Sequence, residues 1–300
     1  MSASPTPPAP PSDGLHGRCL TVRYHPGQPV VIDGQSIDIP TGRITVLIGP
    51  NGSGKSTLLK MLARQLAPDS GEVLMDGRDI AMLSRRAFAR RLGILFQENA
   101  APHGVTVEEL VAHGRYTHQR LFDTFTADDH AAVEAALQRT GIAALRQHWV
   151  SRLSAGQRQL AWIAMALAQE TQYLFLDEPT TFLDLAHQFE IMDLLRALNR
   201  ELGKTLVLVI HDLNLAVRYA DFIFALRDGR ILASGAPAEV LTPAILRQVF
   251  NVEARMIRDD ATGLCFCLPV GKAGSTTTPT SPHADRSSQV GTPLRGVRVE

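Results

Sequence analysis

The stretch from Ile44 to Thr57, with the sequence ITVLIGPNGSGKST, constrains the fold of this chain more than any other. Its first residues are apolar and rich in β-branched side chains, which is typical of a buried strand in a parallel sheet. The residues that follow fit the pattern G-x-x-x-x-G-K-[ST], in which glycines allow backbone N–H groups to surround phosphate oxygens. A helix with apolar residues at Leu58, Leu59, Leu62 and Leu66 comes next. This order of strand, loop and helix predicts a phosphate-binding loop and argues against a glycine-rich turn that binds nothing.

Lys55 and Ser56 supply the chemistry of this loop. Lys55 can reach the β- and γ-phosphates of a nucleoside triphosphate, and the Ser56 hydroxyl can ligate Mg²⁺. The helix that begins at about Lys55 also presents its positive N-terminal end to the anion. The candidate nucleotide-binding residues of the loop are therefore Gly49, Pro50, Asn51, Gly52, Ser53, Gly54, Lys55, Ser56 and Thr57.

Charge and hydropathy narrow the classes of function. Thirty Lys and Arg residues balance thirty Asp and Glu residues, so the overall field gives no reason to expect nucleic acid as a partner. No apolar run approaches the ~20 residues needed to span a bilayer. The N-terminus also lacks the basic and apolar regions of a signal peptide. We therefore expect a globular chain that reaches a membrane only through a partner.

Composition and periodicity divide the chain into five segments. Residues 1–15 and 271–300 are rich in Pro, Ser, Thr and Gly, and we expect both to be disordered. Between them, short apolar strands alternate with amphipathic helices, which predicts the α/β fold of a P-loop NTPase. The nucleotide-binding core and an antiparallel β subdomain are assigned to 16–97, an inserted helical subdomain to 98–155, and the second part of the core to 156–270.

Polar residues recur where the predicted buried strands end. Gln97, the pair Asp177-Glu178, and His211 each follow an apolar run of this kind. In an open α/β sheet, ligands bind at the carboxyl ends of the strands. Asp177 can hold Mg²⁺ through water, and Glu178 can accept a proton from, or orient, the water that attacks the γ-phosphate. A lone glutamine or histidine is more often solvated or structural, but the shared position of these residues around one nucleotide favours function.

The segment LSAGQ, from Leu153 to Gln157, leads into a long predicted helix. Ser154 and Gln157 form a capping box, which satisfies helix N–H donors without any ligand. The same geometry places Ser154 and the backbone N–H of Gly156 beside a positive helix end. The chain thus carries two candidate phosphate-binding helix N-termini.

Tyr24 lies at the end of a predicted strand, Cys19–Tyr24, which pairs with Gln35–Ile39 upstream of the phosphate loop. It either packs within its strand or offers an aromatic face to a nucleotide base. The residues alone leave both alternatives open.

Six motifs occur in a fixed order: GPNGSGKST, Gln97, LSAGQ, YLFLDEP, the pair Leu183-Asp184, and His211. In this order they resemble the ATPase subunit of an ABC transporter, and the resemblance extends from about Arg18 to Val270. It implies a homodimer of ATPase subunits packed head to tail. In such a dimer, ATP on the phosphate loop of one subunit is closed over by the LSAGQ helix end of the other.

The resemblance also implies ATP and Mg²⁺ as cofactors and a role for individual residues. Tyr24 would stack on adenine, Glu178 would be the catalytic base, and His211 would contact the γ-phosphate. Asp184 would communicate across the dimer, and Gln97 would link the Mg²⁺ site to a membrane-spanning partner. The implied catalytic residues are Glu178, His211, Gln97 and Lys55. Outside the loop, the implied nucleotide contacts are Tyr24, Ser154, Gly156, Gln157 and Asp184. The implied metal ligands are Ser56, Gln97 and Asp177.

Three further segments are similar to the ATPases of iron–siderophore, haem and vitamin B12 importers, most of all to the ferric siderophore branch. They are FARRL from Phe88, the segment Val107 to Tyr116 with its GRYTHQ continuation, and LDLAHQ from Leu183. This similarity implies uptake of an iron chelate, with haem, vitamin B12 or another metal as alternative cargo. The implied partners are integral-membrane permease subunits and, through them, a substrate-binding protein. The chain would then be peripheral, on the cytoplasmic face of the cell (inner) membrane.

The sequence departs from the family pattern at a few positions. Ala155 replaces a glycine common in the signature, Leu160 stands where arginine is frequent, and Thr181-Phe182 replaces a smaller pair. The methyl group of Ala155 lies near the presumed phosphate. We expect ATPase activity to be retained, although this methyl group can alter it.

Three rival functions fit the sequence less well. An ABC ATPase that acts on DNA or the ribosome usually shows tandem cassettes or a long coiled coil, and neither a repeat nor heptads is visible. A kinase or another P-loop transferase has no need of LSAGQ. The subunit of an exporter is disfavoured by the segment Val107 to Tyr116 and by the lack of a fused membrane domain.

Overall fold

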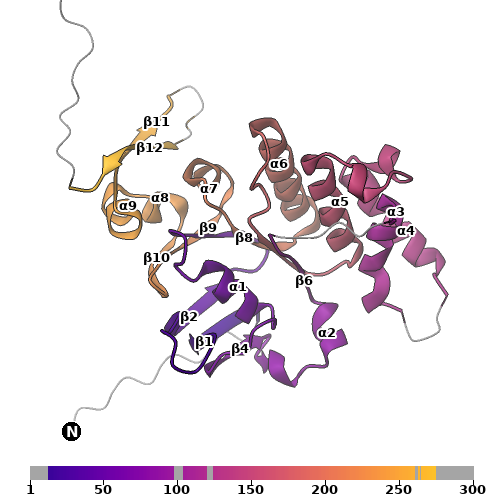
Figure 1. Ribbon diagram of the computed structural model, residues 1–300, viewed down its shortest axis with the longest axis horizontal. Helices are drawn as coiled ribbons and strands as arrows, with labels where there is room; N and C mark the ends of the chain where they lie inside the picture. The colour runs from indigo at the N-terminus through magenta and orange to yellow at the C-terminus, as the bar shows by residue number, and fades with distance from the viewer. Residues whose placement is uncertain (1–12, 98–103, 120–123, 261–262, 264, 275–300) are drawn as a thin grey trace, which may run out of the picture.

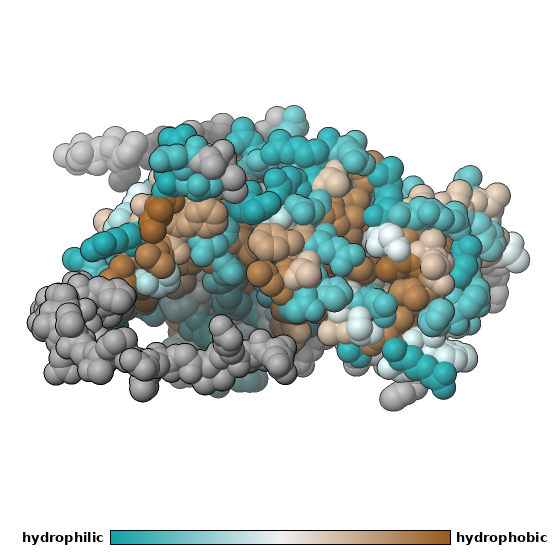
Figure 2. Space-filling model, turned by 90° about the horizontal axis from the view of Figure 1, so that it is seen from above, coloured by the Kyte–Doolittle hydropathy of each residue, from teal (hydrophilic) through white to brown (hydrophobic). Residues whose placement is uncertain are grey.

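The computed structural model describes residues 13–97, 104–119, 124–260, 263 and 265–274 (Figure 1). Most of the two segments predicted to be disordered therefore falls outside the described residues. Within the described ranges, every helix is too short or too polar to cross a bilayer. On the face shown in Figure 2, hydrophobic residues are exposed in several patches among hydrophilic residues.

A six-stranded sheet forms the centre of the molecule, in the order β10-β9-β3-β8-β7-β6. All neighbours in this sheet are parallel except β9 and β10, which form an antiparallel hairpin across Asp228-Gly229. The strands β3, β7 and β8 are buried along their whole length, as their continuous apolar runs predict. The bounds are β3 (Ile44–Ile48), β6 (Leu92–Leu95), β7 (Tyr173–Asp177), β8 (Thr205–Val209), β9 (Phe222–Arg227) and β10 (Arg230–Gly235).

A second, antiparallel sheet of four strands has the order β2-β1-β4-β5. The predicted pairing of the two segments that flank Gly27 is confirmed, although both strands begin earlier than expected. The helix α1 (Lys55–Leu62) lies between this sheet and the central one, and its leucines share a buried cluster with both (Figure 1). The bounds are β1 (Leu15–Val22), β2 (Ile32–Ile39), β4 (Ser70–Met75) and β5 (Arg78–Asp79).

The predicted extension of the first helix to Leu66 is wrong. The helix α1 ends at Leu62, and Arg64 adopts a left-handed backbone conformation with φ 56°. A left-handed residue cannot continue a right-handed helix, so the chain turns here although its apolar spacing continues. Leu66 still packs against the same buried cluster as the leucines of α1.

A group of helices covers the other side of the central sheet. The helices α3 and α4 pack against each other and against α5, whose C-terminal end leads into β7 (Figure 1). The N-terminus of α5, which begins at the LSAGQ segment, therefore belongs to this helical group. The bounds are α3 (Val107–His113), α4 (Ala127–Arg139), α5 (Ala155–Ala168) and α6 (Leu185–Leu202). The short helix α2 (Arg85–Ala89) lies on the side of α1, where its Phe88 belongs to the same buried cluster as the α1 leucines.

The C-terminal part of the chain covers the edge of the sheet near β9 and β10. The helix α7, which we did not predict, begins after Asp212, whose carboxylate accepts hydrogen bonds from two backbone N–H groups of its first turn. A final antiparallel hairpin of β11 and β12 packs against α7 and α9. The bounds are α7 (Leu213–Tyr219), α8 (Pro237–Val240), α9 (Pro243–Phe250), β11 (Val252–Arg258) and β12 (Cys265–Lys272).

Candidate functional site

The loop between β3 and α1 depends on glycine at two positions. A Cβ at Gly49 would lie 2.2 Å from the carbonyl oxygen of Leu226, and one at Gly54 would lie 2.6 Å from the side chain of Ile32. Gly54 also caps α1 in a left-handed conformation with φ 98°. Since α1 has no side-chain cap, its first N–H groups are left to another acceptor. The local structure therefore favours an anion at this helix end.

Lys55 is a buried cation, with 5% of its surface exposed. Its Nζ donates to the carbonyl oxygens of Gly49 at 2.9 Å and Pro50 at 3.0 Å. Burial lowers the pKa of Lys55, while the charges of Glu178 and Asp177 oppose that shift. Because its hydrogen-bond partners are neutral, the Lys55 charge remains available to a bound phosphate.

Ser56 and Asp177 meet at the end of β7. The Ser56 hydroxyl donates to Oδ1 of Asp177 at 2.9 Å, and Asp177 is 6% exposed. Burial raises the pKa of Asp177, and the hydrogen bond from Ser56 lowers it. Both residues line a cavity together with Gln97. Hydroxyl, amide and carboxylate oxygens are ligands that suit Mg²⁺, so this donor set fits the predicted metal.

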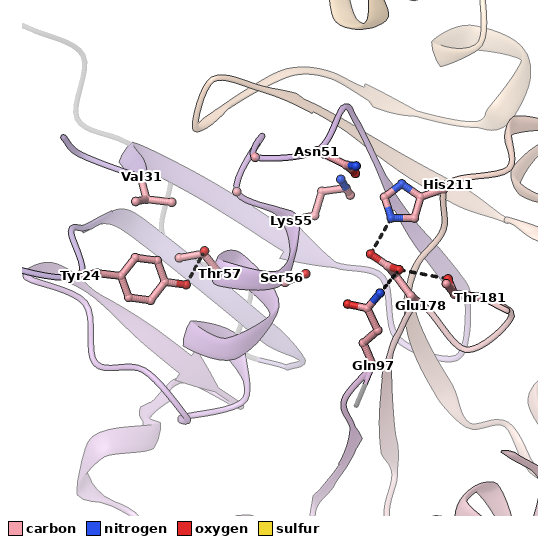
Figure 3. Close-up of a pocket in the computed structure, with 12 residues that line it drawn as sticks. Tyr24, Val31, Asn51, Lys55, Ser56, Thr57, Gln97, Glu178, Thr181 and His211 are labelled. Carbon is pink, nitrogen blue, oxygen red and sulfur yellow. Dashed lines mark hydrogen bonds and ion pairs between the residues drawn. The ribbon is translucent and has the colours of Figure 1, made fainter. Parts of the chain in front are cut away.

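Glu178 is held by side chains from three segments (Figure 3). Its Oε2 accepts hydrogen bonds from Nε2 of Gln97 at 2.5 Å and from the Thr181 hydroxyl at 3.0 Å. Its Oε1 lies 2.5 Å from Nε2 of His211. Glu178 also has a positive φ of 54°, which is uncommon for a glutamate and typical of backbone held in place at functional sites. The result is a carboxylate with a fixed orientation.

These residues surround one cavity of about 880 Å³. It brings together the phosphate loop and the three strand-end residues, as the sequence predicts. The predicted residues that line it are Tyr24, Asn51, Gly52, Gly54, Lys55, Ser56, Thr57, Gln97, Glu178 and His211. Gly49, Pro50 and Ser53 are part of the same loop but do not line the cavity, and Asp177 lines the adjoining one.

Two residues that line the cavity were not predicted from the sequence as site residues. Thr181 bonds to Glu178, and Val31 lies opposite it across the cavity (Figure 3). The position of Thr181, three residues after the glutamate, is the signal that could have identified it. Val31 gives no chemical signal, because only the tertiary fold brings it to the site.

Tyr24 lies two residues beyond the end of β1 and not within a strand as predicted. Its hydroxyl lies 2.9 Å from that of Thr57 at the start of α1, and 48% of its surface is exposed. The ring thus stands at the rim of the cavity (Figure 3). It is fixed at its polar end and leaves much of its aromatic surface free for another group.

The second helix N-terminus has a different environment. Ser154 and Gln157 form the predicted capping box, in which each backbone N–H donates to the other side chain at 3.2 Å. Asp184 caps α6 and accepts from the backbone N–H of His187 at 2.9 Å. None of Ser154, Gly156, Gln157 and Asp184 lines the cavity that contains Lys55. A single chain therefore does not combine its two candidate phosphate sites.

Comparisons with known proteins agree on one family. The family model described as ABC transporter matches residues 32–181. The achromobactin transport ATP-binding protein of Dickeya dadantii is 49% identical over 258 residues, which cover 86% of this chain and 95% of that protein. The ferric enterobactin transport ATP-binding protein of Escherichia coli is 46% identical over 263 residues, which cover 88% of this chain and 96% of that protein. Among solved structures, a dimeric bacterial ABC transporter cassette is 28% identical with a TM-score of 0.66, and the match covers 74% of this chain and 98% of that cassette.

Proposed function

Because this chain belongs to the ABC transporter family, we propose that it is the ATP-hydrolysing subunit of an importer that takes up a ferric siderophore. The observation that carries this proposal is the Glu178 carboxylate, oriented at the edge of a cavity that also contains Lys55 and Ser56. The cargo class is supported by relatives named for transport, one of them for ferric enterobactin, which align over nearly their whole length.

The chain's own residues divide the chemistry of hydrolysis between them. Lys55 and the backbone of the loop bind the β- and γ-phosphates and offset their charge. Ser56 and Asp177, with Gln97, would hold Mg²⁺, which when bound adds positive charge beside the same oxygens. Glu178 accepts a proton from, or orients, the water that attacks the γ-phosphate in line with the leaving oxygen.

The partners of Glu178 prepare it for this step. His211 and Gln97 hold its two oxygens from opposite sides, so the carboxylate has little freedom to turn away from the water. His211 also stands where it can contact the γ-phosphate, and Tyr24 offers its exposed ring to the adenine. These are the roles that the resemblance to the family implies for the two residues.

A head-to-tail dimer would complete each site. The capped N-terminus of α5 has no part in the cavity of its own chain, and Ser154 is exposed. We propose that it closes over the nucleotide of a second copy. The dimeric cassette with a TM-score of 0.66 to this chain supports such an arrangement.

Closure of this dimer, driven by ATP, would move a pair of permease subunits between access states. These integral-membrane subunits would hold the chain at the cytoplasmic face of the inner membrane and connect it to a substrate-binding protein. The names of the relatives as ATP-binding transport proteins support a separate ATPase subunit of this kind.

Co-purification of the tagged chain from its native membranes tests this function. We expect the chain to hydrolyse ATP and to bring with it a permease of many membrane spans and a binding protein for a ferric chelate. Recovery of only soluble partners, ribosomes or DNA would overturn the transport function. The same preparation, reconstituted in vesicles, would identify the cargo by its ATP-dependent uptake.

A further inference from the structure

His187 connects the two elements that a second copy would meet. It lies in the first turn of α6, directly after the loop that contains Asp184. Its ring Nδ1 lies 2.8 Å and 2.9 Å from the two carboxylate oxygens of Asp184, and its backbone N–H donates to the first of them at 2.9 Å. Since carboxylate oxygens only accept, Nδ1 must carry the proton and donate it.

The opposite edge of the same ring lies against Gly156. A Cβ at this position would lie 2.3 Å from Cδ2, 2.9 Å from Cγ and 3.0 Å from Nε2 of His187. The two shorter distances are below any real Cβ contact, so a larger residue at 156 fits only if the ring of His187 moves away. The present position of the ring beside Asp184 therefore depends on glycine at 156.

We propose that His187 is a positioning residue, which joins the Asp184 loop to the N-terminus of α5 so that both meet the partner's nucleotide as one unit. This inference rests on the proposed dimer. The side chain of Asp184 is 67% exposed and that of His187 is 38% exposed. Without their mutual hydrogen bonds, both side chains could rotate among several rotamers in solvent. The hydrogen bonds and the contact with Gly156 restrict them to one arrangement before the second copy arrives, which lowers the cost of ordering on association.

The stability of the single chain is a minor part of this role. Because solvent screens an exposed pair of this kind, its contribution to the stability of the single chain is small. The backbone N–H of His187, and then its ring, lower the pKa of Asp184, so its carboxylate stays ionised and continues to accept both bonds. The larger effect is therefore expected on dimer formation and not on folding.

Three substitutions in a Glu178→Gln background test the proposal. This background is expected to bind ATP without turnover, so that the dissociation constant of the ATP-bound dimer can be measured by analytical ultracentrifugation. We expect His187→Ala to weaken the dimer about tenfold, which corresponds to about 1.4 kcal/mol. ATP binding to the monomer, measured with a fluorescent ATP analogue, is expected to stay the same.

Replacing His187 by asparagine or by glutamine shows which ring nitrogen, Nδ1 or Nε2, is needed. The amide nitrogen of asparagine can take the place of Nδ1 and donate to Asp184, whereas that of glutamine can take the place of Nε2. We expect His187→Asn to restore most of the dimer affinity and His187→Gln to restore little. Glu190→Ala, an exposed change one turn further along α6, is the control and is expected to leave the affinity unchanged.

The outcomes separate this inference from the function on which it rests. If the Glu178→Gln parent fails to form a dimer with ATP, the proposed dimer itself is wrong. If the parent forms a dimer and His187→Ala matches it, only the positioning role is overturned. Rescue by glutamine and not by asparagine would also overturn it, because the ring would then act through Nε2. If His187→Ala does not fold, the asparagine and glutamine variants decide.

Discussion

The N-termini of α1 and α5 look alike in the sequence but differ in their surroundings. The first has no side-chain cap, holds a buried lysine and opens into a large cavity. The second is closed by its own capping box, and its serine is exposed outside that cavity. The first end supplies the charge that binds a nucleotide, and the second has only neutral donors to offer. In the proposed dimer, one chain therefore contains a nucleotide-binding site and, on a different surface, the helix end that closes the site of the second copy.

Lys55→Ala removes the positive charge at the N-terminus of α1 and should have the largest effect on activity. Removal of a buried ammonium group that bonds to phosphate is expected to weaken ATP binding about 10- to 100-fold and to abolish hydrolysis. Isothermal titration with ATP and Mg²⁺ measures the binding. Unchanged ATP affinity would show that the cavity at α1 is not the nucleotide site.

Ser154→Arg disrupts the capped N-terminus of α5 and leaves the site at α1 intact. The long cation replaces the cap and occupies the surface that would face the second copy, so hydrolysis should fall about 100-fold. ATP binding to the monomer should not change, because Ser154 does not line the cavity. Ser151→Arg adds the same charge at an exposed position three residues earlier and is the control. Equal losses in both variants would show that added charge, and not the cap, is responsible.

Asp177→Asn tests the site at the N-terminus of α1 through the pH dependence of thermal stability. Because burial raises the pKa of Asp177, its ionised form destabilises the nucleotide-free protein at neutral pH. The protonated Asp177 carboxyl therefore contributes to stability. This contribution is fully present below the pKa of Asp177 in the unfolded chain, and it is lost as the pH rises through the raised pKa in the folded protein. The amide oxygen of the substituted side chain can still accept the bond from Ser56 without a charge. We expect the variant to have a higher Tm than the wild type at neutral pH and a weaker response to Mg²⁺ with ATP.

The gap in Tm between Asp177→Asn and the wild type should narrow as the pH falls from neutrality toward the raised pKa, since Asp177 then becomes protonated. Thermal unfolding at a series of pH values checks this direction. A gap that widens in acid would contradict the assignment of the buried carboxylate.

Ala155→Gly is expected to have the smallest effect. Ala155 is the first residue of α5 and is exposed, so glycine should cost less than about 1 kcal/mol of stability. If the methyl group lies near the partner's phosphate, kcat should change by about two- to threefold with unchanged ATP binding to the monomer. An equal kcat would show that the methyl group is immaterial.

The sequence predicts the first helix end better than the second because the two depend on different kinds of information. The spacing of Gly49, Gly54 and Lys55 determines a local loop, and the acids at the end of β7 follow from one buried strand. The helix that follows is shorter than predicted, because the left-handed backbone at Arg64 ends it although the apolar spacing continues. A correctly recognised motif therefore does not determine the length of the helix beside it.

The contact between His187 and Gly156 joins residues 31 positions apart, and it depends on how α6 packs beside α5. No local spacing encodes such a contact. Thr181 is an intermediate case, because its position near Glu178 is local, but the left-handed backbone at Glu178 that accompanies their hydrogen bond does not follow from that spacing. Most residues that line the cavity were thus accessible from the sequence, whereas the contacts made by Thr181 and His187 were not.

The mass of the Glu178→Gln chain in solution, measured with and without ATP and Mg²⁺, tests the central claim most directly. A site shared between two chains predicts a monomer without nucleotide and a dimer with two bound ATP molecules, which hydrolyses little. Addition of Ser154→Arg to the same chain should prevent the dimer while ATP still binds. A chain that stays monomeric with ATP, in a protein whose wild-type monomer hydrolyses ATP at the full rate, would contradict the account.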